Sequence, residues 1–159
     1  MENDRDLLER IRSQFELDWD GIHGLPHWLR VRDNGLRLAE LTGANRRVVE
    51  LFALLHDSQR WDDGYDPDHG PRAAEFLREL AGDYFHLDPP ELELLEYACH
   101  YHSDGYLHGD ITVVTCWDAD RLDLGRVGMR PRAEYLCTAA AQEPAVIEWA
   151  FTRSISRER

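Results

Sequence analysis

A histidine and an aspartate stand side by side at positions 56 and 57, directly after the almost entirely apolar segment VVELFALL, residues 48–55. A helix that is apolar on every side is a buried helix. The segment therefore predicts that His56 and Asp57 are carried into the interior of the protein. An unpaired buried carboxylate is so costly that it takes up a proton or requires a cation. A divalent metal ion, which imidazole and carboxylate groups both bind, would satisfy the pair.

Two more side chains of metal-binding type are predicted to face the same interior. His27 shares a helical face with Val31 and Leu38, and Asp120 shares one with Trp117. The spacing thus predicts four ligands from three packed helices. They are His27, His56, Asp57 and Asp120.

Each of these side chains also has a purely structural interpretation. His27 could be a core histidine bonded to a backbone carbonyl, and the pair at 56–57 could be a helix end with an exposed carboxylate. The segment DADRLD, residues 118–123, could be a solvated helix face, or could turn Asp118 inward in place of Asp120. The presence of all four side chains in this order favours the metal site.

The elements that must position these side chains are predicted to be helices from end to end, with apolar residues at helical spacing. Gly43 is placed to end one helix and Asn45 to begin the next. The composition of ITVVTCW, residues 111–117, leaves a strand as an alternative there. The predicted helices are 3–18, 26–41, 46–58, 71–81, 90–102, 111–124 and one from 133 that is interrupted near 144. The expected fold class is all-α, a single domain over residues 1–159 with about six or seven helices.

Composition restricts the classes of function. With 18 basic and 31 acidic residues the formal net charge is −13, which disfavours binding to nucleic acid or to an anionic membrane. Three widely separated cysteines, Cys99, Cys116 and Cys137, are typical of buried reduced thiols. No stretch approaches the roughly 20 apolar residues of a membrane-spanning helix. The expected location is therefore cytoplasmic.

The ordered set resembles the HD-domain metal-dependent phosphohydrolase superfamily. The resemblance covers roughly residues 20–125 and is carried by HWLRV at 27–31, ALLHD at 53–57 and DADRLD at 118–123. It implies a helical bundle of HD type, and it makes Asp120 rather than Asp118 the ligand in the last motif. It also implies a divalent transition metal as cofactor: Mn, Fe, Co, Ni or Zn, as one or two ions.

Two further motifs bear on a second ion. His69-Gly70 and Tyr101-His102-Ser103-Asp104-Gly105 are similar to segments of those members, including symmetrical diadenosine tetraphosphate hydrolases, that hold two metals bridged by the aspartate of the doublet. The resemblance implies that His69 and one of His100 or His102 are added ligands. The chain departs from the pattern in offering both of these histidines and in a loop of only eleven residues between Asp57 and His69.

The implied activity is hydrolysis of a phosphoester or phosphoanhydride of a small phosphorylated substrate by metal-activated water. A nucleotide is expected from the resemblance alone, and the sequence leaves the oligomeric state open, with a homodimer as one alternative. No nucleophilic serine or cysteine motif and no glycine-rich phosphate loop is present. Two alternatives remain, a dinuclear-iron oxygenase on the same fold and a non-catalytic module that binds metal or nucleotide.

Roles can be assigned to individual residues on this basis. Asp57, His69 and His102 are the predicted catalytic residues. Arginines that follow the two metal motifs are predicted to bind substrate phosphate, since guanidinium pairs well with phosphate oxygens. They are Arg60, Arg126 and Arg130, with exposed loop positions as the alternative for the last two. His23, beside glycine, is expected at the surface, where it could contact substrate.

Overall fold

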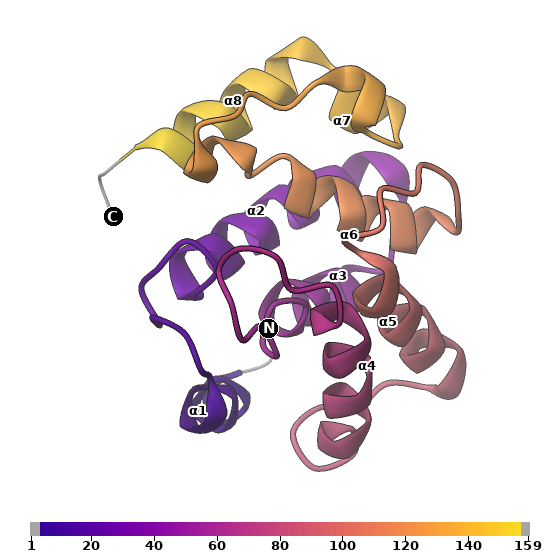
Figure 1. Cartoon of the computed structure of the whole chain (residues 1–159). Helices are drawn as coiled ribbons and strands as arrows, with labels where there is room; N and C mark the ends of the chain where they lie inside the picture. Colours follow the sequence, from indigo (N-terminus) through magenta and orange to yellow (C-terminus); the bar gives the residue numbers. More distant parts are fainter. Residues whose placement is uncertain (1–3, 157–159) are drawn as a thin grey trace.

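The computed structural model describes residues 4–156, and within that range it is helical with no strand (Figure 1). This confirms the predicted all-α class, and the strand alternative for residues 111–117 is wrong because they lie in a helix. Eight α-helices are described, one more than expected, because Pro144 divides the last predicted helix in two. They are α1 (Arg5–Gln14), α2 (Leu25–Thr42), α3 (Arg46–Leu55), α4 (His69–Leu80), α5 (Pro89–Tyr101), α6 (Ile111–Arg121), α7 (Ala139–Gln142) and α8 (Pro144–Ile155). Two short 3₁₀ helices, η1 (Leu124–Val127) and η2 (Ala133–Tyr135), lie between α6 and α7.

Local chemistry explains where the helices that carry the site begin and end. α2 has Pro26 in its first turn and ends at Gly43, whose φ of 80° is accessible to glycine without strain. Asn45 caps α3 by accepting a hydrogen bond from the Val48 amide, as expected. α6 begins in the same way, because the Asp110 carboxylate accepts a hydrogen bond from the Thr112 amide.

The first helix is shorter than predicted. α1 ends at Gln14, and Phe15 is extended. The ring of Phe15 packs edge-on against Trp19 and Trp28, with ring centroids 5.9 and 5.2 Å apart. This aromatic contact requires the chain to leave the helical path, which periodicity alone does not show. Residue 3 of the predicted helix lies outside the described residues.

The main core surrounds α3. Every side chain of α3 from Leu51 to Leu55 is fully buried, and α3 contacts α2, α5 and α6. A second apolar cluster lies beneath α8 and includes Leu38, Leu122 and Ile147. In Figure 1, α7 and α8 lie on one side of α2 and α6, with α3, α4 and α5 on the other. Residues that begin or end α2 to α6 therefore meet close to the core.

Two glycines let helices approach closely where the site will form. A Cβ at Gly35 of α2 would lie 2.3 Å from Val49 Cγ1 of α3, and one at Gly70 of α4 would lie 2.5 Å from the His100 carbonyl oxygen of α5. Neither distance is sterically possible without movement. Glycine thus permits the contacts that bring α2 to α3 and α4 to α5.

Two sequence expectations can be compared directly with the structure. All three cysteines are free thiols; Cys99 and Cys116 are buried and Cys137 is partly exposed. Across the described part of the chain, no helix combines the length and the apolar character needed to cross a membrane.

Candidate metal centre

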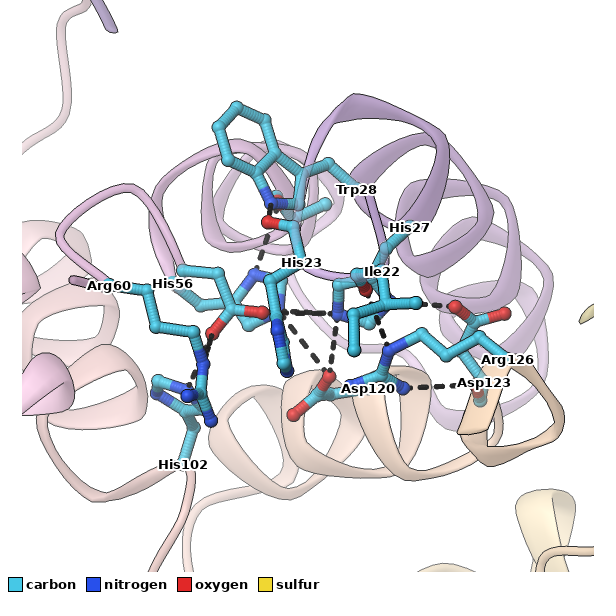
Figure 2. A network of polar contacts seen from close by, with 12 residues as sticks. Ile22, His23, His27, Trp28, His56, Arg60, His102, Asp120, Asp123 and Arg126 are labelled. Carbon is cyan, nitrogen blue, oxygen red and sulfur yellow. Dashed lines mark hydrogen bonds and ion pairs between the residues drawn. The ribbon is translucent and has the colours of Figure 1, made fainter. Parts of the chain in front are cut away.

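Six side chains from five helices converge at one place in the bundle. Figure 2 labels four of them, His27, His56, His102 and Asp120. Each stands at or near the end of a helix: the first turn of α2 or α4, the residues just after α3 or α5, and the last turn of α6. The four histidines and Asp57 are all at least 95% buried, whereas Asp120 keeps 16% of its side chain exposed. The six are His27, His56, Asp57, His69, His102 and Asp120.

Asp57 joins two histidine pairs. Its Oδ2 lies 3.3 Å from His27 Nε2 and 3.4 Å from His56 Nε2. Its Oδ1 lies 3.4 Å from both His69 Nε2 and His102 Nε2. Each pair, together with Asp57, forms a group whose ligand atoms lie within 4.8 Å of one another and could hold a metal ion. One carboxylate therefore faces two adjacent candidate ion positions.

Asp120 belongs to the first of these positions. Its Oδ1 lies 3.2 Å from His27 Nε2 and 3.3 Å from His56 Nε2. That oxygen is buried, yet no hydrogen bond of acceptable geometry reaches it. A buried carboxylate oxygen without a donor requires another positive partner. A metal ion at this position fits the unsatisfied oxygen.

The hydrogen bonds that the Nδ1 atoms make, on the side of each ring away from Asp57, decide which ring nitrogen can bind a metal ion. His56 Nδ1 donates to the Phe52 and Ala53 carbonyls, at 3.1 and 3.0 Å. His69 Nδ1 donates to the Asp66 carbonyl at 2.5 Å, and His102 Nδ1 donates to the Cys99 carbonyl at 2.7 Å. A carbonyl oxygen accepts but cannot donate, so in the neutral ring Nδ1 carries the proton and Nε2 presents a lone pair. These Nε2 atoms are the ones that face Asp57.

Electrostatics show the same demand for positive charge. Burial would raise the pKa of Asp57, but His56 and the close contacts of the other three histidines hold it well below its usual value. Burial would also raise the pKa of Asp120, and His56 and His27 again lower it strongly. Both carboxylates are therefore ionised. They attract either protons on the imidazoles or metal ions between them.

In the metal-free protein, the imidazole of His27 has a raised pKa and therefore holds a proton. Burial and the nearby Arg126 lower its pKa, but the close carboxylates of Asp120, Asp123 and Asp57 raise it to about 9. Metal binding requires the neutral ring, so an ion must displace this proton. The donor set fits that exchange, because every carboxylate that attracts the proton at Nε2 also attracts a cation.

Two arginines border the cluster without being neutralised by a hydrogen-bonded carboxylate (Figure 2). Arg60 Nη1 donates to the Asp62 and Gly64 carbonyls at 2.7 and 2.9 Å, and its Nε lies 3.7 Å from Asp57 Oδ1. Arg126 donates from Nε to the Ile22 carbonyl at 3.0 Å and from Nη1 to the Asp123 carbonyl at 2.9 Å. Carbonyl partners hold a guanidinium group in place and leave its charge available to an anion.

Other predicted residues are placed elsewhere. The His100 ring packs against Tyr101 and lines a groove of about 700 Å³ between α4 and α5, so of the two histidines only His102 joins the cluster. Arg130 was predicted to bind substrate, but the structure pairs it with Glu148 of α8 and lays it over the Phe151 ring. Gly128, whose φ is 83°, ends η1, and Arg130 in the segment that follows lies against α8.

Asp118, the alternative inward aspartate of α6, has a structural role. It is fully buried and accepts hydrogen bonds from the Cys137 amide at 2.7 Å and from the Thr138 amide and hydroxyl, both at 2.8 Å. It therefore fixes the start of α7 and makes no contact with the cluster in the described structure.

Two residues beside the cluster have partners that the sequence did not predict. His23, expected at the surface, is only 6% exposed and donates Nδ1–H to Asp63 Oδ1 at 2.8 Å. Asp123 contacts His27 Nδ1 at 2.6 Å. The spacing of Asp120 and Asp123, three residues apart, was a usable signal for Asp123. His23 carried no such signal, because its partner lies 40 residues away.

The ends of the helices in this all-helical bundle thus gather buried imidazoles and carboxylates in one cluster. Neither a scan against protein-family models nor a search of the curated proteins finds a match. A search of solved structures finds the crystal structure, at 1.45 Å resolution, of a predicted HD superfamily hydrolase from an uncultured Thermotogales bacterium. The TM-score is 0.70 and the sequence identity 25%, over 95% of this chain and 86% of that chain. The chain has the HD-superfamily fold, and its buried cluster could hold a metal ion, which together support a hydrolase.

Proposed function

We propose that the protein is a metal-dependent phosphohydrolase that cleaves a phosphoester or phosphoanhydride of a small substrate. The observation that carries this proposal is the position of Asp57 between two histidine pairs, with one carboxylate oxygen toward each. Two cations side by side suit a phosphoryl group, which has several anionic oxygens to neutralise.

The residues of the cluster divide into two ligand sets. One ion would be held by His27, His56, Asp120 and Asp57 Oδ2, and a second by His69, His102 and Asp57 Oδ1. Mixed imidazole and carboxylate donors suit Mn, Fe, Co, Ni or Zn. When bound, such an ion polarises a phosphoryl oxygen and lowers the pKa of a coordinated water.

The remaining contribution of the chain is to attract and orient the anion. The net charge of −13 repels a phosphorylated substrate at long range. Arg60 and Arg126 reverse that sign locally, because their hydrogen bonds to carbonyls leave the guanidinium charges for phosphoryl oxygens. Burial of the histidines keeps bulk water away and strengthens each of these interactions.

A nucleotide is the substrate we propose within this class. This part of the proposal is supported by the resemblance to HD phosphohydrolases and by one side chain. Trp61, next to Arg60, is 58% exposed. The guanidinium carbon of Arg72 lies over one face of its ring, 3.7 Å from the ring centroid. A ring held on one face by a cation can stack a base on the other.

The test is a turnover assay with defined metal content. Protein purified without chelator is stripped, reloaded with Mn²⁺, Co²⁺, Ni²⁺, Zn²⁺ or Fe²⁺, and supplied with p-nitrophenyl phosphate, nucleoside monophosphates or dinucleoside polyphosphates. We expect metal-dependent release of phosphate or nucleotide, with one oxygen from ¹⁸O-labelled water in the product. Arg60→Ala and Arg126→Ala should each raise KM roughly 10-fold or more, whereas Arg130→Ala serves as the matched control and should not.

Two results would contradict the proposal. Tight nucleotide binding without turnover under any of these metals would indicate a non-catalytic module. Oxygen consumption by the iron-loaded protein, with no incorporation of label from water, would indicate an oxygenase.

A further inference from the structure

The four histidines of the cluster are not held in the same way. His56, His69 and His102 donate their Nδ1 protons to backbone carbonyls. His27 Nδ1 instead contacts a side chain, Asp123 Oδ2, at 2.6 Å. No substitution can remove a backbone carbonyl, so of these four rings His27 is the one whose orientation depends on the identity of another residue.

Asp123 is itself rigidly held. It is fully buried, and Arg30 donates to both of its oxygens, from Nε to Oδ1 at 2.7 Å and from Nη2 to Oδ2 at 3.1 Å. Arg30 lies one turn after His27 on α2, so a single helix supplies both the ring and the cation. The two hydrogen bonds from Arg30 fix the position and the orientation of the Asp123 carboxylate.

A carboxylate at Nδ1–H affects an imidazole more strongly than a neutral carbonyl does. It fixes the orientation of the ring and increases the electron density at Nε2, which makes the ring a stronger metal ligand. Asp120 Oδ1 also lies 3.2 Å from His27 Nε2, while the group of His69 and His102 has only Asp57 as its carboxylate donor. Both differences favour a cation at the His27 position.

We infer that Asp123, backed by Arg30, is a positioning residue that holds His27 toward the metal and makes the His27 position the tighter of two unequal ion positions. The inference deepens the proposed function and rests on it only for the presence of bound metal. Its readout is metal affinity, which can be measured whether or not the protein turns over a substrate.

The experiment is a calorimetric titration of metal-free protein with Zn²⁺ and with Co²⁺, in competition with a chelator of known affinity. We expect two binding steps for the wild type. Asp123→Asn should weaken the tighter step about 10- to 100-fold and leave the weaker step within error. In a His102→Ala background, which lacks a ligand of the second position, the step that remains should be the one that Asp123→Asn weakens.

Asp118→Asn is the matched control, because Asp118 is a fully buried aspartate of the same segment that bonds the chain near α7 and not a histidine. It should lower the melting temperature and leave both binding steps unchanged. Equal weakening of both steps by Asp123→Asn, no weakening at all, or the same effect from Asp118→Asn would overturn the inference.

If Asp123→Asn does not fold, the inference can still be tested with the variant Arg30→Gln and with a proton NMR spectrum of the wild type. Arg30→Gln retains the contact between Asp123 and His27 and should weaken the tighter step by less than Asp123→Asn. In the Zn²⁺-loaded wild type, the His27 Nδ1 proton should resonate further downfield than those of the other three rings, because its acceptor is charged. A Nδ1 proton at the same position as theirs would contradict the inference. Normal metal binding without phosphate release would contradict the proposed function alone.

Discussion

The Nε2 atoms of His69 and His102 lie 2.9 Å apart, although the Nδ1 atom of each ring donates to a backbone carbonyl. In the neutral rings, two lone pairs therefore face each other in a buried site. The Nε2 atoms of His27 and His56 are also close, at 3.1 Å, although Nδ1 of His27 bonds to the Asp123 carboxylate and not to a carbonyl. Such an arrangement is stable when a cation lies between the lone pairs, and the predictions below follow from it.

His102→Ala should remove one of two ions. The substitution deletes a ligand of the group formed with His69 and leaves the His27 group intact. The metal content measured by elemental analysis should fall from about two equivalents per chain to about one. His100→Ala is the control, because that ring lies in the groove between α4 and α5. Loss of metal from the His100 variant, or full content in the His102 variant, would refute this assignment.

Asp57→Ala should abolish binding of both ions, since both groups include this carboxylate. The helical circular dichroism signal should persist, because the core around α3 does not include Asp57. Asp62→Ala, in the exposed loop that follows, is the comparison and should retain metal. If the Asp57 variant kept its full metal content, the assignment of the site would be wrong.

Gly70→Ala should weaken the second position through the backbone. The added Cβ would lie 2.5 Å from the His100 carbonyl, so α4 and α5 must separate. We expect a loss of about 1–3 kcal/mol in the free energy of unfolding, which exceeds the gain of about 1 kcal/mol from replacing a helical glycine. Metal titration should show the weaker step reduced and the tighter step unchanged. Gly109→Ala, where a Cβ meets atoms at ordinary contact distances of 3.6 Å and more, is the control.

The metal-free protein should lose stability at alkaline pH. The pKa of His27 is raised from 6.5 to about 9, so its contribution is complete below pH 6.5 and disappears as the pH rises through about 9. The change is about 3 kcal/mol at most. Asp57 and Asp120 have lowered pKa values, so their contribution is present above pH 3.8 and disappears in acid. Chemical denaturation between pH 6 and pH 9 measures the first effect.

Bound metal should have the opposite effect on stability between pH 6 and pH 9. Binding displaces the His27 proton, so affinity rises with pH, and the stability difference between loaded and metal-free protein should widen toward pH 9. His27→Gln should flatten the metal-free profile above pH 6.5. A flat wild-type profile would show that His27 holds no extra proton in the metal-free protein.

The sequence by itself determined the helical class and most of the ligand set. The apolar segment ending at Leu55 directed His56 and Asp57 inward, and helical spacing placed His27 with the core. Capping at Asn45 and Gly43 followed from local chemistry. These features depend on residues within a few positions of one another, which a linear sequence displays.

Only the tertiary structure decided the relationships between distant segments. His102 rather than His100 meets His69, because the ring after the end of α5 turns back toward Cys99. His23 is buried and forms a hydrogen bond with Asp63, 40 residues away. Arg126 lies beside the cluster, whereas Arg130, beyond Gly128, pairs with Glu148 of α8. Periodicity specifies the face of a helix, but the meeting of two faces depends on packing among helices, which no single segment encodes.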